Sequence, residues 1–125
     1  MIDASLLIAI DRDEPDAKEF IEATLLEEEP LRTTAPVVAQ VWPDGARQAR
    51  LARFLPTLDI RPFASDQYQD VGKLLRRSGT SDVVDAHLLA CAIYLGDRII
   101  TADVSDFVQL SAHLGAAAPL AESWR

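Results

Sequence analysis

Residues 80–107 read TSDVVDAHLLACAIYLGDRIITADVSDF, in which a helix pattern leads directly into a strand pattern. Thr80 and Ser81 are typical N-cap residues, and Gly96 is a typical residue for the end of a helix. Between them, apolar residues recur at helical spacing on one face: Val84, Leu88, Leu89, Ala92 and Leu95. The run Arg98–Thr101 then predicts a short buried strand. A helix that leads straight into a buried strand is typical of α/β proteins with parallel sheets.

The rest of the chain continues this alternation of helix and strand. Periodicity, proline positions and turn residues predict a tight turn over residues 3–5 followed by a helix to about residue 11, and helices over residues 14–28, 36–42, 46–55 and 65–79. Residues 102–107 are expected to lead into a short helix that ends near residue 115. Short strands are expected at residue 2 and over residues 31–34, 58–63 and 117–121. With 125 residues and no linker or internal repeat, the chain is expected to form one domain over residues 1–125. The expected fold is α/β, with a central, mainly parallel sheet of four or five strands flanked by helices.

Composition excludes several classes of protein. Hydrophobic residues make up 49% of the chain, which is too many for a disordered protein. Cys91 is the single cysteine, so an internal disulfide and a cysteine-based zinc site are both excluded. Apolar runs are too short to cross a bilayer, and Met1–Ile10 lacks the basic start of a signal peptide. We therefore expect a cytoplasmic protein with no membrane partner.

The charge is distributed unevenly along the chain. The formal net charge of −8 argues against a nucleic-acid partner, because binding to phosphates needs clustered Lys and Arg. Residues 47–77, however, hold 7 basic and 3 acidic residues, whereas the segments on both sides are acidic. Such a basic middle is compatible with a surface that follows phosphates beside a cation-dependent site. A solvated helix face explains the same charges equally well.

Several acids fall where the predicted strands end. Asp3 interrupts the apolar N-terminal run, and Asp103 closely follows the Arg98–Thr101 strand. Asp82 and Asp85 lie in the first turn of the helix before that strand, where they could also simply complement the helix dipole. Ligands of open α/β sheets bind at the carboxyl ends of the strands. Carboxylates that meet there repel one another unless a cation binds, and oxygen ligands favour Mg²⁺ or Mn²⁺.

Four segments together resemble the PIN-domain family, and most closely the ribonuclease toxins of VapBC-type toxin–antitoxin pairs. These segments are Ile2–Ser5, Ala39–Trp42, Asp85–Ala90 and Thr101–Phe107. The resemblance implies a PIN-like three-layer sandwich and a Mg²⁺- or Mn²⁺-dependent endoribonuclease. It also implies a homodimer and a cognate VapB-like antitoxin that covers the site.

Carried over residue by residue, the resemblance assigns the metal to Asp3, Asp85 and Asp103. Gln40 stands where the family usually has a carboxylate, so that position contributes an amide oxygen without charge. Asp82 and Asp106 lie close enough in sequence to compensate with additional contacts. Hydrolysis would use a metal-activated water and no protein nucleophile.

Further side chains are candidates for supporting roles. Ser5 and Thr101 could place hydroxyls near the metal or the phosphate. Arg47, Arg50 and Arg53 recur three residues apart, so on one continuous helix they would form a surface for RNA phosphates. His87 is expected on the helix surface, without a catalytic role, and Cys91 in the core.

Two alternatives keep an α/β fold. In the first, Gln40 has weakened metal binding, and the chain is a catalytically attenuated or inactive PIN scaffold that binds RNA or a partner. In the second, the acidic pocket belongs to a phosphate-signalling receiver-type module. That module needs adjacent acids after the first strand and a lysine near the last strands, whereas the last lysine here is Lys73.

Overall fold

The computed structural model describes the backbone of residues 1–125 and every side chain except that of Ala46. The α-helices are α1 (Ala4–Asp11), α2 (Pro15–Leu26), α3 (Ala35–Val41), α4 (Ala49–Phe54), α5 (Tyr68–Ser78), α6 (Val83–Leu95) and α7 (Val104–Ser111). Short 3₁₀ turns are η1 (Gly45–Arg47), η2 (Leu55–Thr57) and η3 (Ala112–Ala117). The strands are β1 (Arg32–Thr34), β2 (Asp59–Arg61), β3 (Ile99–Thr101) and β4 (Ala121–Ser123). The α/β class predicted from the sequence is confirmed.

All strand pairs are parallel, but the strands are short. β1 pairs with β2, and β3 pairs with β4, so the ladders form two two-stranded sheets. The N-terminal segment runs between them, because the Ile2 N–H donates to the Arg32 carbonyl (2.7 Å) and the Asp3 N–H to the Ile100 carbonyl (3.2 Å). A parallel bridge between Ile2 and Ile100 completes this link. The expected parallel sheet is therefore present, and it is small.

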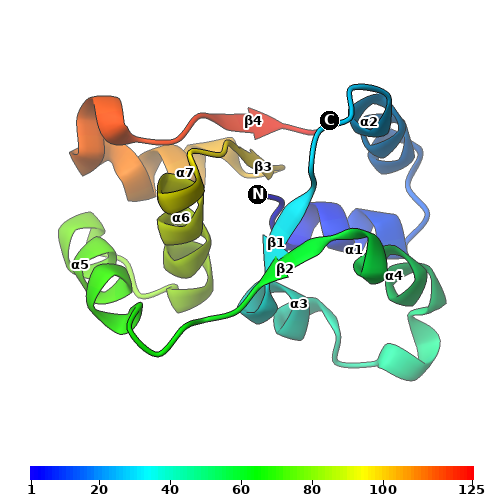
Figure 1. Ribbon diagram of the computed structural model, residues 1–125, viewed down its shortest axis with the longest axis horizontal. Coiled ribbons are helices and arrows are strands. Elements are labelled where there is room, and N and C mark those ends of the chain that lie inside the picture. Colours follow the sequence, from blue (N-terminus) through cyan, green and yellow to red (C-terminus); the bar gives the residue numbers. More distant parts are fainter.

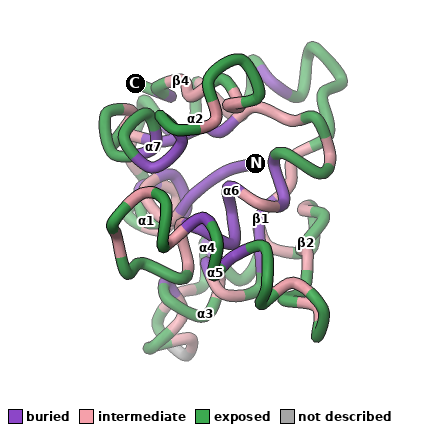
Figure 2. The backbone as a smooth tube through the Cα atoms, turned by 90° about the vertical axis from the view of Figure 1, so that its left-hand side faces the viewer, coloured by how far each residue is buried: buried purple, intermediate pink, exposed green. Residues whose placement is uncertain are grey.

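Helices pack in two groups beside the strands. Figure 1 shows α5, α6 and α7 on the left and α1 to α4 on the right, with the N-terminus between the groups. The N-terminal segment is buried through the middle of the molecule (Figure 2). Around it lies an apolar core whose fully buried side chains include Ile2, Leu6, Leu7, Leu88, Leu89 and Ile99. In the described chain, no helix is long and apolar enough to span a bilayer.

The start of α6 differs from the prediction. Asp82, rather than Thr80 or Ser81, is the N-cap, because its side chain accepts a hydrogen bond from the Asp85 N–H (3.0 Å). The Thr80 hydroxyl lies instead 3.0 Å from the hydroxyl of Ser78. The end of the helix agrees with the prediction, since Gly96 adopts the left-handed conformation (φ 64°) that glycine tolerates.

Two other boundaries also shift. α5 begins at Tyr68 and not near Ser65, because the Gln67 side chain accepts a hydrogen bond from the Ala64 N–H (2.7 Å) and holds a turn there. β4 lies later than residues 117–121, since η3 continues to Ala117 and the ladder with β3 begins only after it.

Candidate active site

Asp3 lies at the end of the N-terminal segment and caps α1. One oxygen of its carboxylate accepts hydrogen bonds from the Ser5 N–H (3.0 Å) and the Ser5 hydroxyl (2.6 Å). The other oxygen accepts the hydroxyl of Thr101 (2.6 Å). Burial raises the pKa of Asp3, which is only 6% exposed, while these hydrogen bonds act in the opposite direction. The carboxylate is therefore held in one orientation at the strand end.

Ser5 connects Asp3 to two distant parts of the chain. Its hydroxyl oxygen accepts hydrogen bonds from the Ala102 N–H (2.9 Å) and from the indole N–H of Trp124 (3.0 Å). With both acceptor positions used, its single proton is directed to Asp3. Trp124 is buried, and sequence reasoning did not identify it as part of the site. Nothing local indicated this contact, because Trp124 and Ser5 are 119 residues apart.

Thr101 connects Asp3 to the next segment of the site. Its fully buried hydroxyl donates to Asp3 and accepts the backbone N–H of Asp103 (2.9 Å). Asp103 is the residue before α7, its side chain is exposed, and it makes no cap hydrogen bond. The structure thus brings both predicted hydroxyls, Ser5 and Thr101, onto Asp3, and it brings the backbone of Asp103 beside them.

Asp85 lies in the first turn of α6. Its pKa is raised from 3.8 to about 7, first by burial and then by the charges of Asp82, Asp3 and Asp106. These acids come from the start of α6, the start of α1 and the first turn of α7. Charges from three segments of the chain thus act on Asp85, and Asp103 is not among the acids that raise its pKa.

Gln40 lies apart from this hydrogen-bond network. It is exposed in the last turn of α3, a helix that packs against both α1 and α6. Its uncharged amide adds nothing to the repulsion that acts on Asp85.

Comparison with known proteins identifies the fold family. The profile of the PIN domain matches residues 1–111. The chain belongs to the PIN-domain family. A comparison with curated proteins gave no match.

A solved structure resembles this PIN domain over its whole length. It is the crystal structure of VapBC2 from Rickettsia felis bound to a DNA fragment from their promoter. The matched chain is 17% identical, the TM-score is 0.76, and the match covers 100% of this chain and 98% of that chain. At this identity the likeness shows a shared fold.

The donor set of this PIN domain fits a hard divalent cation. Carboxylate oxygens are the preferred ligands of Mg²⁺ and Mn²⁺, and a bound cation would relieve the repulsion that raises the pKa of Asp85. Among the described residues, no group of three or more Asp, Glu, His or Cys side chains lies close enough together to hold a metal ion. Mg²⁺ commonly uses one or two carboxylates and completes its shell with water and substrate phosphate. Asp3 and Asp85 are the carboxylates that would hold such an ion.

The three arginines proposed for RNA contacts do not share one helix. Arg47 lies in η1, whereas Arg50 and Arg53 lie in α4. The break falls at Gln48, whose backbone is not helical (φ −107°, ψ 52°) and whose side-chain amide donates to the Val41 carbonyl (2.6 Å). The prediction of one continuous helix over residues 46–55 is therefore wrong.

Two of these arginines also have carboxylate partners within the chain. Arg47 pairs with Asp44 (3.7 Å) and Arg50 with Asp13 (3.6 Å). Both pairs are well exposed to solvent, so a phosphate could compete for either guanidinium.

His87 is buried, contrary to the prediction of a surface position. Its ring stacks on Phe63 with centroids 4.4 Å apart, and its Nε2 lies 2.9 Å from Oε1 of Gln67. Cys91 Sγ lies 3.5 Å from the same nitrogen and is buried, as predicted. This cluster fixes α6 against the segment before α5 and gives His87 a packing role.

Proposed function

We propose that this PIN domain is the toxin of a VapBC-type pair and hydrolyses RNA phosphodiester bonds with Mg²⁺ or Mn²⁺. The observation that carries the proposal is Asp85, whose pKa is raised to about 7 by burial and then by neighbouring carboxylates that include Asp3, which is itself held by two hydroxyls. Such repulsion is costly for a folded protein and is relieved by a cation. The PIN family and the VapBC2 likeness support the same conclusion.

Asp3 and Asp85 would be the principal ligands, with Asp103, Asp82 and Asp106 as further acidic contacts. A bound cation would supply an activated water and stabilise the charge that develops on the phosphate. Ser5 and Thr101 direct their protons to Asp3, which orients its carboxylate and opposes the rise in its pKa that burial causes. Asp82 also caps α6 and thereby fixes the backbone that carries Asp85.

The proposal includes partners for the acidic surface of the chain. A cognate antitoxin would present basic residues to these carboxylates, since complementary charge speeds and orients association. The likeness to VapBC2 supports an antitoxin partner. A homodimer and the contacts of Arg47, Arg50 and Arg53 with RNA also belong to the proposal.

Gln40 supports a second candidate, a PIN scaffold that binds RNA or a partner but cleaves slowly or not at all. An amide at this position removes one negative charge from the ligand set. Restoring Glu at position 40 separates the two candidates, because a large gain in Mn²⁺ affinity and activity would identify an attenuated site.

Mn²⁺ titration calorimetry on the purified protein tests the metal site. We expect Asp3→Asn to weaken Mn²⁺ binding, and Asp66→Asn, an exposed carboxylate outside the cluster, to leave it unchanged. Equal Mn²⁺ affinity in the Asp3→Asn variant and the unmodified protein would refute the ligand assignment. Cleavage of RNA, lost in the same variant, is the corresponding test of activity.

A further inference from the structure

A second basic site lies away from the carboxylates, in a hollow between α5, α6 and η3. The hollow has a volume of about 350 Å³. Its lining includes Lys73, Arg77 and His113, together with apolar side chains and Tyr94. We infer that this hollow binds one nucleotide unit of a single-stranded RNA, with the phosphate on Arg77 and His113, Lys73 along the wall between, and the base against Tyr94.

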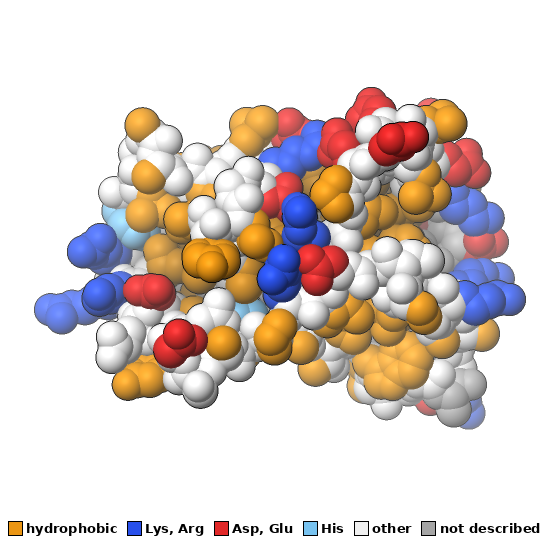
Figure 3. Space-filling view, viewed as in Figure 1, with side chains coloured by type: hydrophobic (Ala, Val, Ile, Leu, Met, Phe, Trp, Pro, Cys, Tyr) orange, Lys and Arg blue, Asp and Glu red, His pale blue; other side chains and the backbone are white. Residues whose placement is uncertain are grey.

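Cations that lack carboxylate partners are concentrated on α5. Most basic side chains of the chain are paired, as expected where 20 acidic residues face 12 basic ones. For Lys73, Arg76 and Arg77, by contrast, no carboxylate oxygen of the described side chains lies within 4.0 Å. Figure 3 shows Lys and Arg side chains gathered at the edge formed by α5, with a histidine beside them.

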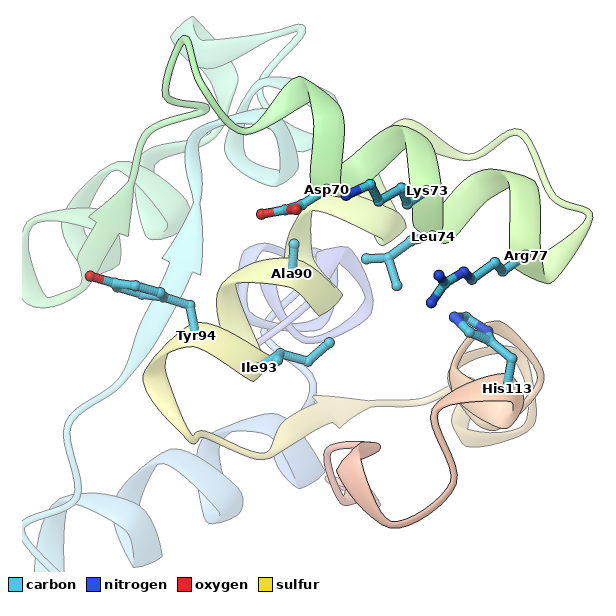
Figure 4. Close-up of a pocket in the computed structure, with 8 residues that line it drawn as sticks. All are labelled: Asp70, Lys73, Leu74, Arg77, Ala90, Ile93, Tyr94 and His113. Carbon is cyan, nitrogen blue, oxygen red and sulfur yellow. The ribbon is translucent and has the colours of Figure 1, made fainter.

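Lys73 and Arg77 are one helical turn apart, so they lie on the same face of α5. The Arg77 guanidinium faces the His113 imidazole at one end of the hollow (Figure 4). A guanidinium offers a planar fork of donors that matches phosphate, and a neutral imidazole still donates one N–H. Arg77 and His113 thus form an end of the hollow that suits an anion, whereas the Lys73 ammonium lies on the Asp70 side of the hollow (Figure 4).

The other end of the hollow suits a base. Tyr94 lies there, opposite Arg77 and His113 (Figure 4), and its side chain is 86% exposed. An exposed aromatic ring beside a basic groove is the usual platform for a base of single-stranded RNA. Leu74, Ala90 and Ile93 supply apolar surface between the two ends.

Asp70 also lines the hollow and would repel a phosphate placed next to it. In Figure 4 its carboxylate lies nearer Tyr94 than the pair of Arg77 and His113 does. This position suits a base, because a carboxylate accepts a hydrogen bond from an exocyclic amino group such as that of cytosine. The hollow therefore favours a nucleotide with a defined orientation, phosphate toward η3 and base toward the end of α6.

This inference rests on the proposed function, because it assigns the same RNA a second contact. Asp85 and Tyr94 both lie on α6, nine residues apart. Nine residues of helix rise about 13 Å, which corresponds to roughly four stacked nucleotides. A strand cleaved at the carboxylates could thus reach the hollow along α6.

The test is RNA binding without cleavage. A short fluorescein-labelled single-stranded oligoribonucleotide is titrated with protein in EDTA, and its anisotropy is followed over a range of salt concentrations. We expect the double variant Lys73→Gln, Arg77→Gln to bind more weakly, with a salt slope reduced by roughly 0.7 for each phosphate that the variant no longer neutralises. Tyr94→Ala should weaken binding about fivefold or more, because the base then has no aromatic ring on which to stack.

Arg76→Gln is the matched control, because Arg76 is an exposed neighbour on α5 outside the lining of the hollow. Affinities and salt slopes equal to this control in the double variant would overturn the inference. So would a double variant that changes only the sedimentation of the protein, which would make the hollow a contact between protein chains.

A parallel titration with free AMP separates the two sources of a nucleotide. AMP binding that depends on Lys73 and Arg77, with unchanged oligoribonucleotide binding, would overturn the RNA contact. The binding assay needs neither metal nor hydrolysis. If RNA binding depends on Lys73 and Arg77 but the protein cleaves no RNA, only the proposed activity is refuted.

Discussion

Replacing Asp85 by Asn should stabilise the folded protein while it disables the proposed metal site. Burial makes the charge of Asp85 costly, and the charges of Asp82, Asp3 and Asp106 add to that cost. Asn has almost the same shape and carries no charge, so the substitution removes the repulsion without opening a cavity. Residues selected for catalysis often reduce stability in this way.

The size of the effect follows from the pKa of Asp85. A rise from 3.8 to about 7 is a shift of about 3 pKa units, which corresponds to about 4 kcal/mol if fully expressed. Asp85 is only partly buried, so solvent screening reduces the expected gain to about 2 kcal/mol. For a domain of this size, such a gain raises the melting temperature by about 8 °C.

The gain must depend on pH in one direction. Because the pKa of Asp85 is higher in the folded than in the unfolded protein, ionisation of Asp85 destabilises the folded state. This destabilisation is absent below about pH 4, where Asp85 is protonated in both states, and it grows as the pH rises toward 7. Urea unfolding in EDTA should therefore find the Asp85→Asn variant more stable at pH 8 and equal to the unmodified protein near pH 4. Asp66→Asn is the control. An Asp85→Asn variant that is less stable than the unmodified protein at pH 8, or equally stable at every pH, would refute the conclusion that the charge of Asp85 destabilises the fold.

Two other substitutions test the surroundings of the carboxylates. Trp124→Phe removes the donor to Ser5 and should cost about 1 kcal/mol in urea unfolding. It should also weaken Mn²⁺ binding about tenfold in calorimetry, whereas unchanged Mn²⁺ affinity would mean that Trp124 only fills space. Gln40→Glu adds a carboxylate, and Mn²⁺ affinity should change less than about threefold if the site is already competent without it. A gain of about tenfold or more in Mn²⁺ affinity would instead identify the attenuated site of the second candidate.

The architecture could be predicted where the signal is local. The pattern from Val84 to Gly96, followed by Arg98–Thr101, predicted α6 and β3, because apolar periodicity and a glycine end are properties of adjacent residues. Asp3 could be placed at a strand end for the same reason. Its neighbours Ser5 and Thr101 were candidates because hydroxyls flank the acids in sequence.

Contacts between distant segments could not be predicted in this way. His87 was expected at the surface because the ring of Phe63 and the amide of Gln67, which cover it, come from another segment. Trp124 reaches Ser5 only because β4 pairs with β3 at the centre of the fold. The prediction that three arginines share one helix face was wrong because the backbone of Gln48 is not helical and its side chain donates to the Val41 carbonyl.

The carboxylates around Asp3 are proposed to form a metal-dependent centre for RNA hydrolysis. The most direct measurement is cleavage of total cellular RNA by the purified, antitoxin-free protein in Mg²⁺, in Mn²⁺ and in EDTA, beside the Asp3→Asn variant. We expect discrete fragments with either metal, and none in EDTA or with the variant, which should retain a cooperative melting transition. Fragments that persist in the variant or in EDTA, or their absence from folded protein in both metals, would contradict the claim.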